Sequence, residues 1–223
     1  MLWSDFLSHQ GRRSIKWSHY FPAYERHLAR FRNQSVTVFE IGVAYGGSAQ
    51  LLKKYLGPLV QIVGLDIMEE CREMEEEQIS IRIGDQSDTA FLQSVIDEFG
   101  PPDIVIDDGS HLQPHVNATF DFLYPLTDKN GLYAVEDLHT AYWASYGGGL
   151  RKPDTFIERA KGFIDELHAE TANSGGLADL PVTEFRRSTL SMHVYDSLVI
   201  FERGVPPKLY MPTMGAEPPT ASG

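Results

Sequence analysis

Residues 38–48 read V-F-E-I-G-V-A-Y-G-G-S, an apolar run that enters a glycine-rich turn. The β-branched and aromatic residues before the turn predict a buried strand over residues 36–43. The apolar spacing that follows predicts a helix over residues 48–56, which Gly57 and Pro58 end. A strand that passes through a tight glycine turn into a helix is the first unit of an open α/β sheet.

The rest of the chain repeats this unit. Four further strands are predicted over residues 61–67, 79–85, 103–108 and 131–137, and further helices over 88–99, 114–126 and about 154–171. Alternation of strands with helices predicts parallel strands joined by right-handed crossovers. The run S-M-H-V-Y-D-S-L-V-I-F-E-R, broken near Asp196 and Ser197, predicts an antiparallel hairpin. We therefore expect an α/β, Rossmann-like, mostly parallel seven-stranded sheet with a C-terminal antiparallel hairpin and helices on both faces, the layout of class I methyltransferases.

Length and composition predict one substantial core in a chain of 223 residues. We expect three parts: an N-terminal lid or helical segment over 1–35, a catalytic domain over 36–205, and a Pro/Gly-rich tail over 206–223. The net charge of −12 argues against nucleic acid and against anionic membrane as partners. A single cysteine, Cys71, allows no internal disulfide, and the start of the chain shows no secretory signal, so we expect a cytoplasmic protein.

Acidic side chains follow the predicted strands at the edge where an open α/β sheet binds ligands. Asp66 follows Gly42 at the spacing of a ribose-binding acid, and Asp85 and Gln86 are placed to meet an adenine edge. Ala44 interrupts the glycine pattern of a dinucleotide fingerprint, and no basic cluster is present to bind a pyrophosphate. Each acid alone is also compatible with a helix cap or a solvated strand end. Together they favour a nucleoside without a pyrophosphate, such as S-adenosylmethionine (SAM).

The fourth and fifth strands end in the stretches D-I-V-I-D-D-G-S-H and V-E-D-L-H-T. Their carboxylates converge at one edge of the sheet, where they require a cation; oxygen ligands favour Mg²⁺ or another hard divalent ion. We assign Asp108 to the metal and Asp107 to orienting the cofactor or the metal shell, because neighbouring strand residues point to opposite faces. Glu136 and Asp137 can both bind the ion only if the strand ends there. His111 is suited to remove a proton from a hydroxyl, although a lone histidine is often structural.

These motifs, in this order, resemble those of the Mg²⁺-dependent class I sugar O-methyltransferases, which act on sugars of macrolides, rhamnosylated natural products and mycobacterial saccharides. The resemblance covers residues 36–143, with weaker support from K-W-S-H-Y-F-P-A-Y near the start. The cephalosporin hydroxylase-type proteins share the motifs. The resemblance implies a homo-oligomer that methylates a hydroxyl of a saccharide or glycoside with SAM and Mg²⁺.

The resemblance also implies roles for single residues. His111 is the expected general base, and the metal is expected on Asp108, Glu136 and Asp137. The predicted cofactor-binding residues are Glu40, Gly42, Tyr45, Gly46, Gly47, Ser48, Asp66, Asp85, Gln86 and Asp107.

Aromatic side chains after the metal motif are candidates for contacts with a sugar ring, although packing against the core explains each of them equally well. The predicted substrate-contacting residues are Tyr142, Trp143, Tyr20 and His139. Two alternatives to the methyltransferase remain: a SAM- and metal-binding hydroxylase-type protein of the cephalosporin hydroxylase group and, ranked below it, a nicotinamide-dependent oxidoreductase.

Overall fold

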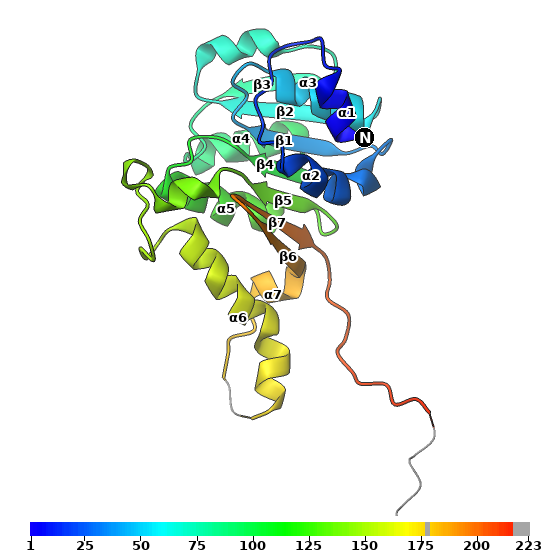
Figure 1. The fold of residues 1–223 in the computed structure, drawn as a ribbon, viewed down its shortest axis with the longest axis vertical. Helices are drawn as coiled ribbons and strands as arrows, with labels where there is room; N and C mark the ends of the chain where they lie inside the picture. Colours follow the sequence, from blue (N-terminus) through cyan, green and yellow to red (C-terminus); the bar gives the residue numbers. More distant parts are fainter. Residues whose placement is uncertain (177–178, 216–223) are drawn as a thin grey trace, which may run out of the picture.

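The computed structural model describes residues 1–176 and 179–215, which form one seven-stranded sheet with helices on both faces (Figure 1). The strand order is β3-β2-β1-β4-β5-β7-β6. The strands from β3 to β5 are parallel, whereas β7 is antiparallel to both β5 and β6. The bounds are Thr37–Ile41 (β1), Gln61–Asp66 (β2), Ile79–Ile83 (β3), Ile104–Asp107 (β4), Leu132–Val135 (β5), Thr189–Tyr195 (β6) and Leu198–Arg203 (β7). The predicted fold class is confirmed.

The four helices predicted with bounds lie close to those bounds; α2 lies in the N-terminal segment that was expected to be a lid or helical, and α1 and α7 are additional short helices. Thr155 begins the longest helix because its hydroxyl accepts a hydrogen bond from the Glu158 N–H (3.4 Å). The α-helices are Leu2–Leu7 (α1), Tyr20–Leu28 (α2), Gly47–Leu56 (α3), Thr89–Phe99 (α4), Gln113–Leu126 (α5), Phe156–Ser174 (α6) and Glu184–Ser188 (α7). Short 3₁₀-helices span Ala29–Phe31, Glu69–Met74, Leu138–Tyr142 and Ala144–Tyr146.

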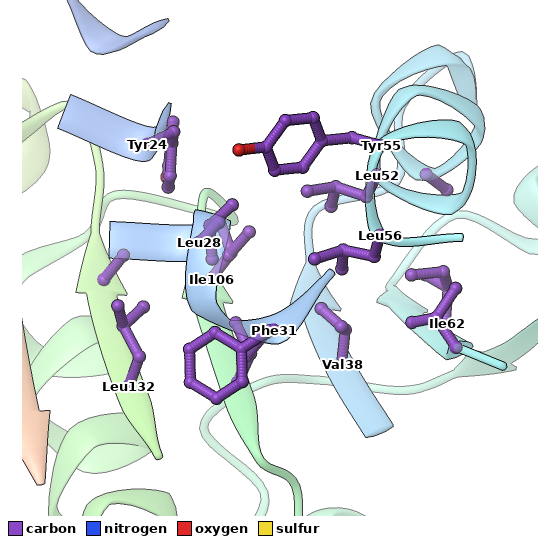
Figure 2. Close-up of a cluster of buried hydrophobic side chains, with 14 of the residues drawn as sticks. Tyr24, Leu28, Phe31, Val38, Leu52, Tyr55, Leu56, Ile62, Ile106 and Leu132 are labelled. Atoms are coloured by element: carbon purple, nitrogen blue, oxygen red, sulfur yellow. The ribbon is translucent and has the colours of Figure 1, made fainter. Parts of the chain in front are cut away.

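Each face of the sheet has its own apolar core. One core joins α1, α2 and α3 to the sheet, and Figure 2 shows Tyr24, Leu28, Leu52 and Tyr55 converging there. The other core joins α4, α5 and α6 to the opposite face. Successive strand residues alternate between the two cores, which is why the strands are apolar on both sides.

The N-terminal segment shares the first core with the sheet: Leu2, Tyr20 and Phe21 are all buried in it. After β7 the chain runs away from the body of the molecule (Figure 1), and residues 204–215 contain no helix or strand. The remainder of the predicted tail, residues 216–223, lies outside the described residues. Within the described residues, no helix has both the length and the apolar composition needed to cross a bilayer.

The direction of chain winding changes between β1 and β4. From β1 the sheet grows one way through β2 and β3, and the other way through β4 and β5. In open α/β sheets the crevice beyond the carboxyl ends of such a strand pair is where ligands bind. The residues that follow β1 and β4 therefore lie at the expected ligand site.

Candidate active site

Two adjoining pockets lie beyond the carboxyl ends of the strands. The larger one, a cleft of about 350 Å³, is bordered by the ends of β1, β2, β3 and β4. The smaller one, of about 200 Å³, is lined by Ile15, Lys16, Trp17, Asp108, Glu136 and Asp137. Asp108 borders both pockets, so a ligand in the cleft and a ligand in the smaller pocket would lie next to each other.

The turn after β1 places backbone at the edge of the cleft. Gly42 has a φ of +91°, and a Cβ atom there would lie 2.1 Å from the Asp108 carbonyl oxygen, so only glycine fits. A Cβ atom on Gly47 would lie 2.3 Å from the Arg13 carbonyl oxygen, because the N-terminal segment crosses the start of α3. Gly46 adopts a φ of +73° directly before that helix. The glycines of this turn thus admit both the loop after β4 and the N-terminal segment.

The predicted nucleoside-binding residues lie in the cleft. Asp66 Oδ2 accepts hydrogen bonds from the N–H groups of Val43 (2.8 Å) and Ala44 (3.1 Å). Asp66 therefore shapes the turn after β1 while it borders the cleft. Asp85 also borders the cleft, and hydrogen bonds from the Ser87 N–H and hydroxyl lower the pKa of Asp85.

Gln86 connects the cleft to the buried Asp107. Its amide nitrogen donates to Asp107 Oδ1 (3.1 Å), and its oxygen accepts from the Ser110 N–H (2.6 Å). Asp107 is 1% exposed, and burial raises the pKa of Asp107 to about 7. Asp107 therefore lies behind the cleft wall, where it fixes Gln86.

Three other predicted cofactor residues, Glu40, Tyr45 and Ser48, lie away from the cleft lining. Glu40 is 1% exposed and lies on the face of β1 opposite Phe39 and Ile41, toward Lys16. Neither carboxylate oxygen of Glu40 has a hydrogen-bond partner among the described residues. Tyr45 is exposed, and the centroid of its ring lies 5.0 Å from the Arg13 guanidinium carbon. Ser48 lies in the first turn of α3, directly after the glycine turn.

The smaller pocket is lined by the predicted metal ligands, and the predicted base lies beside two of them. Ligand atoms of Asp108, His111 and Asp137 lie within 4.8 Å of one another. His111 Nε2 is 3.8 Å from Asp108 Oδ1 and 3.8 Å from Asp137 Oδ2. Both strands end before these residues, and His111 and Asp137 have φ values of +56° and +53°. Left-handed backbone at non-glycine residues is costly and is concentrated at functional sites.

Glu136 approaches the same pocket from the buried side. It is 2% exposed, and its Oε1 accepts hydrogen bonds from Lys16 Nζ and from the Tyr24 hydroxyl, both at 2.5 Å. Lys16 Nζ also contacts Asp108 Oδ2 at 2.6 Å. Burial and the Asp108 carboxylate raise the pKa of Glu136, and the Lys16 ammonium opposes that shift. Lys16 is thus the cation that these acids share.

The four predicted substrate residues differ in their exposure. Tyr142 and Trp143 are 46% and 50% exposed, and His139 stacks edge-on against Trp143 at 4.7 Å between ring centroids. Tyr20 is only 1% exposed and does not line the pocket; its hydroxyl lies 2.8 Å from Asp137 Oδ1, so it supports a pocket residue from behind. Trp17, which is 54% exposed, faces His139 at 6.1 Å and extends the aromatic rim.

Several side chains at the site were not assigned from the sequence. Ser110 and His115 border the cleft, and Lys16 and Tyr24 bind the acids of the smaller pocket. The sequence contained one indication of the role of Lys16. A cluster of acids requires a cation, and the stretch K-W-S-H-Y in the N-terminal segment supplies a lysine. Tyr24 is 112 residues from Glu136 and carries no comparable pattern.

Comparison with known proteins finds O-methyltransferases among the relatives of this chain. The chain is 38% identical over 207 residues to demethylmacrocin O-methyltransferase of Streptomyces fradiae, covering 85% of this chain and 50% of the relative. It is also 38% identical over 204 residues to 8-demethyl-8-alpha-L-rhamnosyl tetracenomycin-C 2'-O-methyltransferase of Streptomyces olivaceus, covering 85% of this chain and 52% of the relative. The chain is thus similar to sugar O-methyltransferases over most of its own length. It spans about half the length of the curated relatives it matches.

A solved methyltransferase structure has the same fold over the length of this chain. MycE methyltransferase from the mycinamycin biosynthetic pathway, in complex with Mg, SAH and mycinamycin VI, matches with a TM-score of 0.76 and 35% sequence identity. The match covers 92% of this chain and 53% of MycE. No protein-family model matches the chain.

Proposed function

We propose that the protein is a SAM-dependent, divalent-metal-dependent O-methyltransferase that acts on a hydroxyl of a saccharide or glycoside. The observation that carries the proposal is the position of Asp108, which borders both the nucleoside cleft and the pocket of acids. Transfer of a methyl group requires the donor and the acceptor to be held next to each other. The two adjoining pockets provide that arrangement.

The chemistry of the cleft fits SAM. Its lining includes Asp66 and Asp85 but contains no lysine or arginine among the described residues, so it lacks a clamp for a pyrophosphate. Apolar side chains, including Leu65 and Ile67, complete the wall and suit an adenine ring. We assign Asp66 to the ribose, Asp85 and Gln86 to the adenine edge, and the backbone of the glycine turn to the methionine part. When bound, SAM supplies the methyl group.

The smaller pocket fits a hard divalent cation. We assign the ion to Asp108, Glu136 and Asp137, whose oxygens are the ligands that Mg²⁺ prefers. The grouping of Asp108, His111 and Asp137 supports a cation at this point, and MycE was solved with Mg. When bound, the ion supplies Lewis-acid activation of the acceptor hydroxyl.

His111 is the residue that we assign to proton transfer. Its Nε2 faces the free oxygens of Asp108 and Asp137 across equal distances of 3.8 Å, so it borders the place where an acceptor hydroxyl would lie. His111 Nε2 would take the proton of that hydroxyl as the hydroxyl oxygen bonds to the methyl carbon, while the bond between that carbon and the SAM sulfur breaks and the sulfur keeps the electron pair. The exposed rings of Tyr142 and Trp143, with the half-buried ring of His139 beside Trp143, offer flat faces to the sugar.

We also propose that the enzyme is a homo-oligomer of the cytoplasm. β6 is an edge strand of the sheet and exposes Leu190 and Val194, which supports association through that edge. The buried free thiol of Cys71 suits a reducing compartment. Light scattering of the purified chain tests the oligomer, and a mass equal to one chain contradicts it.

The proposed function is tested by incubating the chain with SAM, Mg²⁺ and a panel of glycosides, including macrolide and rhamnosyl compounds, and by detecting added methyl groups with mass spectrometry. We expect His111→Ala to bind SAM with wild-type affinity in calorimetry but to lose on the order of 10²-fold or more in kcat, because the proton acceptor is removed. The exposed His168→Ala on α6 is the matched control and should retain full activity. Absence of SAM binding by the wild type, or full activity in EDTA, contradicts the proposal.

A further inference from the structure

The three acids assigned to the metal are each held by a side chain of the N-terminal segment 16–24. Lys16 contacts Asp108 and Glu136, Tyr24 donates to Glu136, and Tyr20 binds Asp137. The three donors lie within nine residues of one another, whereas the acids lie 92 to 120 residues further along the chain.

The contacts divide the two oxygens of each aspartate between two tasks. Asp108 Oδ2 is held by Lys16, while its Oδ1 faces His111. Asp137 Oδ1 is held by Tyr20, while its Oδ2 faces His111. In both cases the oxygen that remains free is the one directed into the site.

Tyr20 also holds the backbone of Asp137. Its hydroxyl oxygen accepts a hydrogen bond from the Asp137 N–H (3.1 Å) and lies 3.0 Å from the Ser197 carbonyl oxygen. Asp137 has the left-handed φ of +53°, a conformation that persists only when its surroundings fix it. Tyr20 thus fixes both the backbone and one carboxylate oxygen of Asp137.

We propose that Lys16, Tyr20 and Tyr24 are positioning residues for the metal site: they form an outer shell that holds Glu136 in place and leaves one oxygen of each aspartate directed toward the ion, and this shell thereby sets the affinity for the ion. This inference rests on the proposed function. Hydrogen bonds from outside the ligand set orient carboxylates at metal sites, and their loss typically weakens metal affinity 10- to 100-fold. The N-terminal segment is therefore needed to complete the site.

The test measures metal binding by the full chain without turnover. Mn²⁺ alone, as a substitute for Mg²⁺, is titrated by calorimetry into protein from which metal has been removed with EDTA. Tyr20→Phe and Tyr24→Phe each remove one hydroxyl and are expected to weaken Mn²⁺ binding by about tenfold or more. Tyr55→Phe is the matched control, since it removes a buried hydroxyl from the same core (Figure 2) that has no hydrogen-bond partner among the described residues.

A double variant separates positioning from general loss of stability. If Tyr20 acts through Asp137, Tyr20→Phe should add little to the loss of Mn²⁺ affinity already caused by Asp137→Asn. Wild-type affinity in both tyrosine variants, or equal losses in Tyr20→Phe and Tyr55→Phe, overturns the inference but leaves the proposed function intact. Absence of Mn²⁺ and Mg²⁺ binding by the wild type overturns the metal role and the inference together.

Discussion

Lys16 carries its charge in a nearly buried position. Its side chain is 10% exposed, and its ammonium group contacts Asp108 and Glu136. Burial by itself lowers the pKa of a lysine, but these two carboxylates raise the pKa of Lys16 above its ordinary value. Removal of this cation would leave two neighbouring acids to repel each other in surroundings that screen them poorly.

We expect Lys16→Met to lower the free energy of unfolding of the metal-free protein by about 3 kcal/mol, because it leaves uncompensated buried charge. Added Mg²⁺ should recover part of this loss by neutralising the same acids. Urea denaturation in EDTA and in Mg²⁺ measures both effects. Lys54→Met is the control: Lys54 is 51% exposed in its pair with Asp5, so its loss should cost less than about 1 kcal/mol. Equal effects of the two substitutions contradict the role given to Lys16.

Single residues were predictable where a local pattern marks them. Asp66, Asp85 and Asp108 each follow a recognisable apolar strand, and all three border the cleft. Lys16 and Tyr24 were not assigned, because their contacts join residues 92 to 120 positions apart. Local sequence spacing cannot predict contacts over such separations. The roles given to these residues remain proposals, and the structure supplies only their positions.

At the scale of the element, the turn between β1 and α3 shows how backbone controls the site. Gly42 accepts a left-handed φ and leaves room for the carbonyl group of Asp108, so β1 and the loop after β4 approach closely. The loop after β4 carries Asp108 and His111. A side chain at Gly42 would therefore displace the same loop that holds the proposed ligand and base.

Gly42→Ala is expected to lower the free energy of unfolding by about 2–5 kcal/mol, the combined cost of the positive φ and of overpacking against the Asp108 carbonyl. Gly162→Ala in α6 is the control, because its new methyl group meets nothing within 4 Å. That substitution should stabilise the chain by about 0.5–1 kcal/mol through better helix propensity. Urea midpoints of the two variants measure the difference, and a neutral Gly42→Ala would show that the turn relaxes.

The regular elements were largely predictable because their signals are local. Five strands, the hairpin and four helices follow from apolar periodicity and from glycine and proline at their ends. The observed strands are shorter than predicted by one to three residues: β1 ends at Ile41 and β4 at Asp107, where the chain turns toward the ligand site. The short helices α1 and α7 have too few residues to show periodicity, and they depend on packing against α3 and α6.

At the scale of the whole molecule, the N-terminal segment and the C-terminal hairpin meet beside the site. His27 Nδ1 contacts Glu202 (2.7 Å) in β7, and His19 Nε2 contacts the Asp196 carbonyl oxygen (2.9 Å) in the turn of the hairpin. His139 also contacts this turn, through Ser197 (2.6 Å). Such contacts join α2, the hairpin and the loop after β5, and sequence periodicity gives no sign of them.

Stability of the whole molecule is expected to fall as the pH rises, in part because of Glu40. Burial raises the pKa of Glu40 from 4.5 to about 7, against the opposing effect of Lys16. The folded state therefore holds this proton more tightly than the unfolded state does. The resulting stability is fully present below pH 4.5 and is lost as the pH rises through about 7.

Glu40→Gln removes this titration. Between pH 4.5 and pH 8, the unfolding free energy of the wild type should therefore fall by about 3 kcal/mol more than that of the variant. Urea denaturation at a series of pH values, in EDTA and without SAM, measures the difference. Glu184→Gln is the control, because the Glu184 side chain is 87% exposed; its unfolding free energy should depend on pH in the same way as that of the wild type. Parallel curves for Glu40→Gln as well would mean that Glu40 is charged in the folded state at neutral pH, with Lys16 supplying more compensation than the buried position indicates.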